Sequence, residues 1–124
     1  MWSILPEEAA ASAIGEITIG GVSVRELAET YGTPLHIIDE VGLRRQMRRF
    51  VDGLKSRHNN SEVLFASKSL PIVALYRIAH EEGLAIDVAG GGELQLALAA
   101  GVDPKRLYFH GNAKTDAEIR MAVE

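Results

Sequence analysis

Three groups of polar residues lie at the ends of apolar runs in the second half of the chain. Their side chains and backbone amides are of the kinds that bind or react with a cofactor. Lys68 follows VLFA at 63–66, Asp87 and three glycines at 90–92 close the run that begins at Leu84, and His110 follows LYF at 107–109. A partly desolvated lysine amine can attack a carbonyl carbon and form a Schiff base. An aspartate can orient a cofactor, a histidine can stack on or hydrogen-bond to a bound ring, and the amides of a glycine-rich turn can bind phosphate.

Each of these groups also has an explanation without chemistry. Lys68 could extend into solvent from the rim of a sheet, Asp87 could cap the following turn, and His110 could simply be accommodated at a strand end. The glycines do not complete the dinucleotide fingerprint, because Gln95 stands where its third glycine belongs, and a tight turn that allows close helix–sheet packing is favoured instead. Glu93, in the first turn of a predicted helix, would complement the helix dipole.

The elements that must position these groups alternate with a regular spacing. Apolar runs centred on Phe65, Ile86 and Phe109 are 21 and 23 residues apart, and the helical patterns between them end at Gly83 and Gly101. This spacing predicts an α/β fold of three parallel strands with right-handed helical crossovers. Because the carboxyl ends of parallel strands share one edge of the sheet, the polar groups should meet there. In a sheet of only three strands, the two outer strands each have one side without a partner, which favours a piece of a longer chain.

The first half of the chain has a different pattern. The first fifteen residues are interpreted as a loosely ordered lead-in, and the runs at 17–19 and 35–38 predict two short strands. Ser23 and Glu26 have the spacing of a capping box, which predicts the start of a helix between these two strands. A second helix, beyond Asp39, carries four arginines on its polar face: Arg44, Arg45, Arg48 and Arg49. A solvated helix face is favoured for them over an anion site.

Composition limits the remaining possibilities. The 124 residues carry a net charge of −4, are 47% hydrophobic and contain no cysteine, so disulfides and zinc–thiolate sites are excluded within the chain. A complete (β/α)₈ barrel, about 250 residues long, does not fit. The mild acidity, the lack of a long apolar run and the lack of a secretory signal predict no nucleic-acid or membrane partner and a cytoplasmic protein. The sequence His80-Glu81-Glu82 lacks the second histidine of a zinc-binding helix, and no metal site is predicted.

Three motifs together resemble the diaminopimelate decarboxylase family of pyridoxal-phosphate enzymes, which have the alanine racemase-like fold type III. They are FASKS at 65–69, IDVAGGGEL at 86–94 and FHGNAK at 109–114, and the similarity extends from about Thr33 to Glu124. The last motif is closer to diaminopimelate than to ornithine decarboxylases. Ser69-Leu70 departs from the Ala-Asn that many members have, and this difference bears on the substrate more than on Lys68.

The resemblance implies a function for the chain. It would be the N-terminal part of a decarboxylase that converts meso-diaminopimelate to L-lysine and CO₂ in lysine biosynthesis. Residues 1–38 would belong with a β-domain, and residues 39–124 would form about three βα units of a partial (β/α)₈ TIM barrel. The full-length enzyme would be a homodimer. The groups that bind the phosphate, the pyridine nitrogen and the amino-acid substrate would lie past Glu124, so the chain alone is expected to be inactive.

The resemblance also implies roles for individual residues. Lys68 would form the internal aldimine with pyridoxal 5′-phosphate, and Asp87 and His110 would line the cofactor pocket, with Glu93 and Asn112 near it. Two alternatives stay open. The chain could belong to a related ornithine- or arginine-type decarboxylase or an alanine racemase-like enzyme, or it could act without catalysis, as an interaction fragment.

Overall fold

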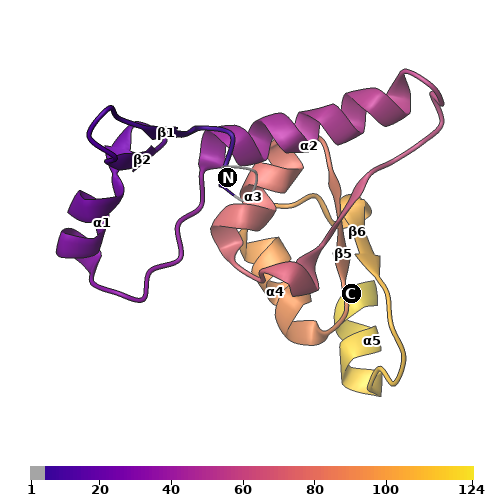
Figure 1. The fold of residues 1–124 in the computed structure, drawn as a ribbon. Helices are drawn as coiled ribbons and strands as arrows, with labels where there is room; N and C mark the ends of the chain where they lie inside the picture. The colour runs from indigo at the N-terminus through magenta and orange to yellow at the C-terminus, as the bar shows by residue number, and fades with distance from the viewer. Residues whose placement is uncertain (1–4) are drawn as a thin grey trace. The chain divides into compact units, whose positions relative to one another are not determined.

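The computed structural model describes residues 5–124, which fall into two compact units (Figure 1). Unit 1 is Met1–Gln46 and unit 2 is Met47–Glu124. The helix α2 (Glu40–Lys55) contributes to both units. None of the helices in the described part of the chain is long and apolar enough to cross a membrane.

Unit 1 contains a small antiparallel sheet of order β1-β2-β3, made of β1 (Ala9–Ala11), β2 (Ile17–Ile19) and β3 (Val22–Ser23). Gly20 and Gly21 form the turn between β2 and β3 with φ of +57° and +82°, the backbone that a two-residue hairpin requires. The helix α1 (Val24–Tyr31) follows, and the Ser23 hydroxyl accepts a hydrogen bond from the Glu26 amide.

Two expectations for unit 1 were wrong. Residues 9–11 do not form a loose lead-in, because they pair with β2, and such cross-strand hydrogen bonds can override the low strand propensity of alanine. The run at 35–38 does not form a strand in the described chain, since no neighbouring strand pairs with it. The strand at 17–19 is confirmed.

Unit 2 confirms the predicted alternation of parallel strands and helices. Its sheet has the order β4-β5-β6, with β4 (Leu64–Ala66), β5 (Ala85–Val88) and β6 (Leu107–Phe109) all parallel. The crossovers contain α3 (Val73–Glu81) and α4 (Gly91–Ala99), and α5 (Asp116–Val123) follows β6. Two short 3₁₀ helices, η1 (Ser67–Ser69) and η2 (Pro104–Arg106), lie after β4 and before β6.

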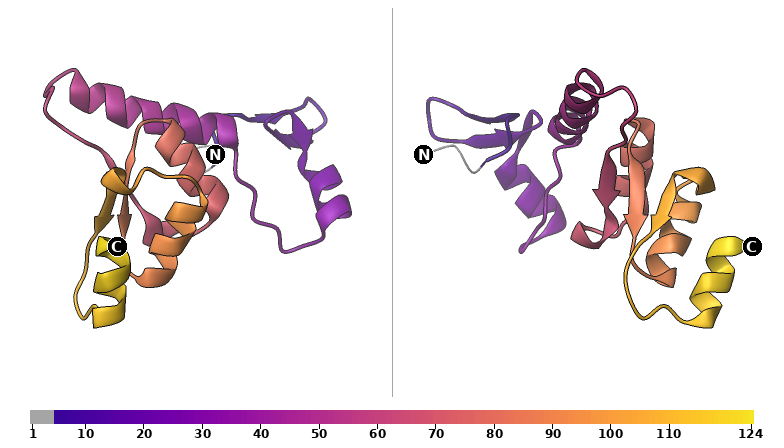
Figure 2. Two further views of the ribbon diagram at one scale, coloured as in Figure 1. Left: turned by 180° about the vertical axis from the view of Figure 1, so that it is seen from behind. Right: turned by 90° about the vertical axis from the view of Figure 1, so that its right-hand side faces the viewer.

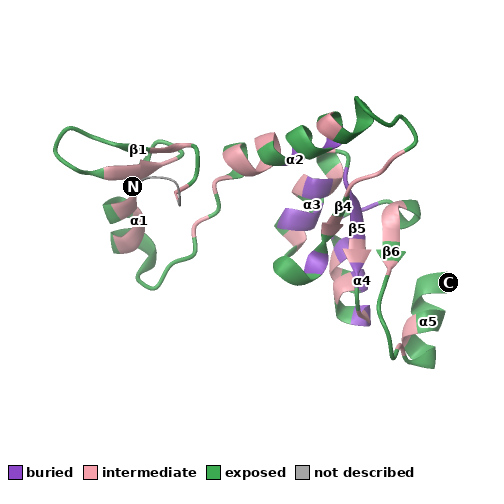
Figure 3. Cartoon of the chain, turned by 45° about the vertical axis from the view of Figure 1, so that its right-hand side comes forward, coloured by how far each residue is buried: buried purple, intermediate pink, exposed green. Residues whose placement is uncertain are grey.

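The two faces of this parallel sheet differ in burial. Phe65, Ile86 and Leu107 are register partners on one face, and the Phe65 ring lies 6.3 Å from the Tyr76 ring of α3, between centroids. The helices α3 and α4 pack beside the sheet (Figure 2). Ile86 is completely buried there, within the core that β5, α3 and α4 share (Figure 3). Because side chains alternate along a strand, Asp87 and its register partner Tyr108 point to the other face, where Tyr108 is exposed. The candidate site residue Asp87 therefore lies on the open face.

Candidate functional site

Lys68 lies in η1, the tight turn that begins where β4 ends. The turn is closed by two local hydrogen bonds, from the Leu70 amide to the Ser67 carbonyl at 3.1 Å and from the Ser69 hydroxyl to the Ala66 carbonyl at 2.8 Å. Ser67, before the lysine, is fully buried, whereas Lys68 itself is exposed. These two bonds hold the backbone of the turn that contains Lys68, and the side chain of Lys68 stays accessible.

Asp87 and His110 approach each other at the same edge of the sheet. Asp87 is the third residue of β5, and His110 follows β6, where its amide donates to the Val88 carbonyl at 2.9 Å. The His110 Nδ1 atom lies 3.9 Å from Asp87 Oδ1. This carboxylate oxygen is buried and accepts no hydrogen bond in the described chain, while the imidazole is 80% exposed. The pair combines an unsatisfied buried acceptor with an accessible aromatic ring.

Glu93 turns back from α4 to the ends of two strands. Its Oε2 atom accepts a hydrogen bond from the Ala89 amide at 2.7 Å and another from the Ser67 hydroxyl. The side chain therefore does more than complement the dipole of α4, because it contacts the segment that contains Lys68. Ser67 was not predicted as a site residue from the sequence. The available signal was its position between an apolar strand and a lysine.

Two of the three glycines, Gly90 and Gly91, lie against Glu118 of α5, whereas a Cβ atom on Gly92 would meet nothing within 4 Å. A Cβ atom on Gly91 would lie 3.2 Å from Glu118 Cγ, so the close approach is to α5. The Gly91 amide donates to Glu118 Oε1 at 3.0 Å, which leaves it unavailable to a phosphate. Glu118 also completes a capping box with Thr115. Hydrogen bonds from the backbone of Thr115 and then of Gly91 lower the pKa of Glu118.

The loop after His110 has a backbone that few residues adopt. Gly111 has φ of +119° and Ala113 has φ of +54°. The Lys114 Nζ atom donates to the Gly111 carbonyl at 2.7 Å and lies 4.7 Å from the ring centroid of Phe109. Asn112, the remaining predicted site residue, is exposed in this loop.

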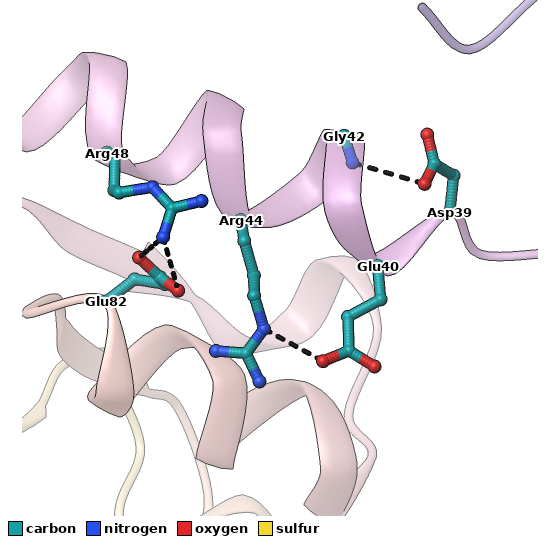
Figure 4. A network of polar contacts seen from close by, with 6 residues as sticks. All are labelled: Asp39, Glu40, Gly42, Arg44, Arg48 and Glu82. Carbon is teal, nitrogen blue, oxygen red and sulfur yellow. Dashed lines mark hydrogen bonds and ion pairs between the residues drawn. The ribbon is translucent and has the colours of Figure 1, made fainter. Parts of the chain in front are cut away.

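Three of the four arginines of α2 are paired with carboxylates. In unit 1, Arg44 Nε lies 2.8 Å from Glu40 Oε1, and in unit 2, Arg48 Nη1 lies 3.1 Å from Glu82 Oε2 (Figure 4). Arg45 pairs with two acidic residues of unit 1, Glu7 and Glu8. The charges of these three arginines are thus balanced within the units.

The described residues contain no cluster of three or more histidine or acidic side chains that could hold a metal ion. The segments that end β4, β5 and β6 supply one accessible amine, one half-buried carboxylate and one exposed imidazole at this edge of the sheet.

Known proteins are similar to this chain in sequence and in fold. Residues 41–124 match the family model described as pyridoxal-dependent decarboxylase, pyridoxal binding domain. A diaminopimelate decarboxylase from Bacillus subtilis is 44% identical over 110 residues, which is 89% of this chain and 25% of the relative. The crystal structure of diaminopimelate decarboxylase from M. jannaschii with L-lysine matches 95% of this chain and 28% of its own, with a TM-score of 0.82 and 28% identity.

A second branch of the family is also similar. A lysine/ornithine decarboxylase from Vibrio vulnificus, crystallised with cadaverine, matches 81% of this chain and 26% of its own, with a TM-score of 0.69 and 30% identity. The chain spans about a quarter of the length of the relatives it matches. These similar structures confirm the partial TIM-barrel fold. On the family match and the shared fold, the chain belongs to the pyridoxal-dependent decarboxylase family, as part of its pyridoxal binding domain.

Proposed function

We propose that this chain supplies the lysine-bearing part of a pyridoxal-phosphate site in an amino-acid decarboxylase that acts on meso-diaminopimelate. One observation carries the proposal: Lys68, Asp87 and His110 come from three successive parallel strands or strand ends and gather at the edge of the sheet where such folds place their active sites. The family match covers all three residues.

The residues present fit pyridoxal phosphate. Lys68 offers an exposed amine that can condense with an aldehyde. The Asp87 side chain is 29% exposed, so its carboxylate can accept a hydrogen bond from a bound group. His110 presents an imidazole ring that a planar ring could stack on. The Gly91 amide is already bound to Glu118, so the phosphate would be held elsewhere.

Each of these residues has a separate task in the proposed reaction. When bound, pyridoxal phosphate supplies an electron sink for the carbanion that loss of CO₂ leaves. The Lys68 amine would hold the cofactor through its aldehyde carbon. Asp87 orients His110, since its Oδ1 atom lies 3.9 Å from the Nδ1 atom of that imidazole. Glu93 and Asn112 lie in the neighbouring segments, and we propose no direct contact of Asn112 with the reacting atoms.

The choice of meso-diaminopimelate, giving L-lysine and CO₂, is supported by sequence identity. The relatives from Bacillus subtilis and Bacillus methanolicus, each 44% identical to this chain over 110 residues, are named diaminopimelate decarboxylases. By the same resemblance we propose that the complete enzyme works in the cytoplasm as a homodimer. We also propose that residues 1–38 belong with a β-domain and that residues 39–124 belong to the barrel.

Trapping with borohydride tests the cofactor site directly. The chain, or a longer protein that contains it, is incubated with pyridoxal phosphate, reduced and mapped by mass spectrometry. We expect the label on Lys68 in preference to the other lysines, Lys55, Lys105 and Lys114. Lys68→Ala should abolish this label, and the control Lys105→Ala, in η2, should leave it unchanged. Equal labelling of all four lysines would contradict the proposed site.

A second assay addresses the substrate and the reaction. In a longer protein that contains this chain, CO₂ release is compared for meso-diaminopimelate, ornithine, arginine and lysine. We expect meso-diaminopimelate to be the preferred substrate. Preference for ornithine or arginine would move the protein to the other branch of the family, and no release from any of the four would favour the interaction fragment.

A further inference from the structure

Glu93 connects the turn that carries Lys68 to the strand end that carries Asp87. A single carboxylate oxygen, Oε2, accepts hydrogen bonds from the Ser67 hydroxyl and from the Ala89 amide. Ser67 immediately precedes Lys68, and Ala89 is two residues beyond Asp87. The two donors belong to segments after neighbouring strands β4 and β5, so the carboxylate bridges the edge of the sheet where the candidate site lies.

This bridge differs from an ordinary helix cap. A glutamate in the first turn of α4 could satisfy the Ala89 amide just before the helix, and that bond alone would be local. The bond to Ser67 spans 26 residues of sequence and serves no terminus of α4. Ser67 is fully buried, so its hydroxyl cannot turn to solvent if the carboxylate is removed.

We propose that Glu93 is a positioning residue that fixes Lys68 relative to Asp87 by holding Ser67 and Ala89 on one oxygen atom. The inference rests on the proposed function, because it assigns Glu93 to the placement of the amine that would bind the cofactor. Hydrogen bonds to a charged acceptor are stronger than those between neutral groups, which suits a carboxylate for this task. Glu93 acts through Ser67 and does not itself need to touch the cofactor.

Two variants separate the bridge from the cap. Ser67→Ala removes the donor from the lysine turn and leaves the Ala89 bond in place. Glu93→Gln keeps the shape of the side chain and removes its charge, so it weakens both bonds. The control, Ser56→Ala, deletes a hydroxyl far from Lys68 in sequence, whose hydrogen bond to the Gly53 carbonyl is local to the end of α2. Circular dichroism checks that each variant folds. If Ser67→Ala does not fold, Glu93→Gln alone tests the proposal.

The measurement is the initial rate at which pyridoxal phosphate and borohydride label Lys68, divided by the rate for Lys105 in the same molecule. We expect this ratio to fall about tenfold in Ser67→Ala and in Glu93→Gln, since small displacements of a reacting group cost large factors in rate. It should stay at the wild-type value in Ser56→Ala. Hydrogen exchange at Ala89 should accelerate in Glu93→Gln and remain slow in Ser67→Ala.

The two proposals fail in different ways. If wild-type Lys68 is labelled no faster than Lys105, the cofactor site itself is wrong, and the positioning role falls with it. If wild-type Lys68 is preferred but the ratio does not change in Ser67→Ala and Glu93→Gln, the cofactor site stands and Glu93 is only a cap of α4. Faster exchange at Ala89 with an unchanged ratio would also reduce Glu93 to a helix cap.

Discussion

The two compact units of this chain are stabilised in different ways. Every buried hydrophobic residue of the described chain belongs to unit 2, where Ile86, Val88 and Tyr76 are almost inaccessible to solvent. In residues 5–46 of unit 1, no residue is buried. Unit 1 depends instead on a glycine turn, a helix cap and ion pairs such as that of Arg45 with Glu7 at 2.8 Å. A site that needs fixed side chains is therefore better placed on unit 2, whose packed core holds the strand ends.

The largest difference between the units should come from core truncation. Ile86→Ala should destabilise unit 2 by about 2–5 kcal/mol, because it leaves a cavity in a closely packed interior. The matched variant in unit 1, Ile19→Ala, should cost about 1 kcal/mol, since Ile19 is only half-buried and less apolar area is lost. Native-state hydrogen exchange reads the two units separately. Equal losses of stability in both variants would show that the two units do not differ in how much they depend on a buried core.

Glycine-to-alanine substitutions should destabilise unit 1 and stabilise unit 2, which is the opposite contrast. Gly21→Ala in unit 1 should be destabilising by about 1–2 kcal/mol, because φ of +82° is unfavourable for a residue with a side chain. Gly92→Ala, in α4 of unit 2, should be stabilising by about 0.4–1 kcal/mol, since no atom lies within 4 Å of the added Cβ and alanine restricts the unfolded chain. Urea unfolding and hydrogen exchange measure both variants. Stabilisation by Gly21→Ala would show that the turn does not limit unit 1.

The smallest effect should come from one charge-dependent contact within unit 2. Hydrogen bonds from the Thr115 and Gly91 amides lower the pKa of Glu118 from its ordinary value of 4.5. A carboxylate with a lowered folded-state pKa stabilises the fold above the unfolded-state value, and this contribution is lost as pH falls through the folded-state pKa. We therefore expect the attachment of α5 to α4 to weaken on acidification below pH 4.5.

Hydrogen exchange at the Gly91 amide is the measurement for this prediction. Protection in wild type should decrease on acidification relative to the intrinsic exchange rate, while Glu118→Gln should show weaker protection at neutral pH and no decrease of this kind. A wild-type profile parallel to that of Glu118→Gln would mean that ionisation of Glu118 does not hold the two helices together.

Several elements of unit 2 could be predicted because their cause is local in sequence. The apolar runs around Phe65, Ile86 and Phe109 and the glycines between them were sufficient for three parallel strands with crossovers. Expectations failed where the cause was a partner from elsewhere. The strand at 9–11 forms because β2 pairs with it, and the run at 35–38, although apolar, has no such partner among the described residues.

The candidate site shows the same division. Lys68, Asp87 and His110 could be chosen from sequence because each follows or ends an apolar strand, and parallel strands must bring their carboxyl ends to one edge. The sequence alone determined the residue types, the period of the elements and the family resemblance. Only the tertiary structure decided that Glu93 holds Ser67 and that Glu118 occupies the Gly91 amide. Those contacts join residues 26 and 27 positions apart, and no local pattern specifies which side chains meet once helices pack.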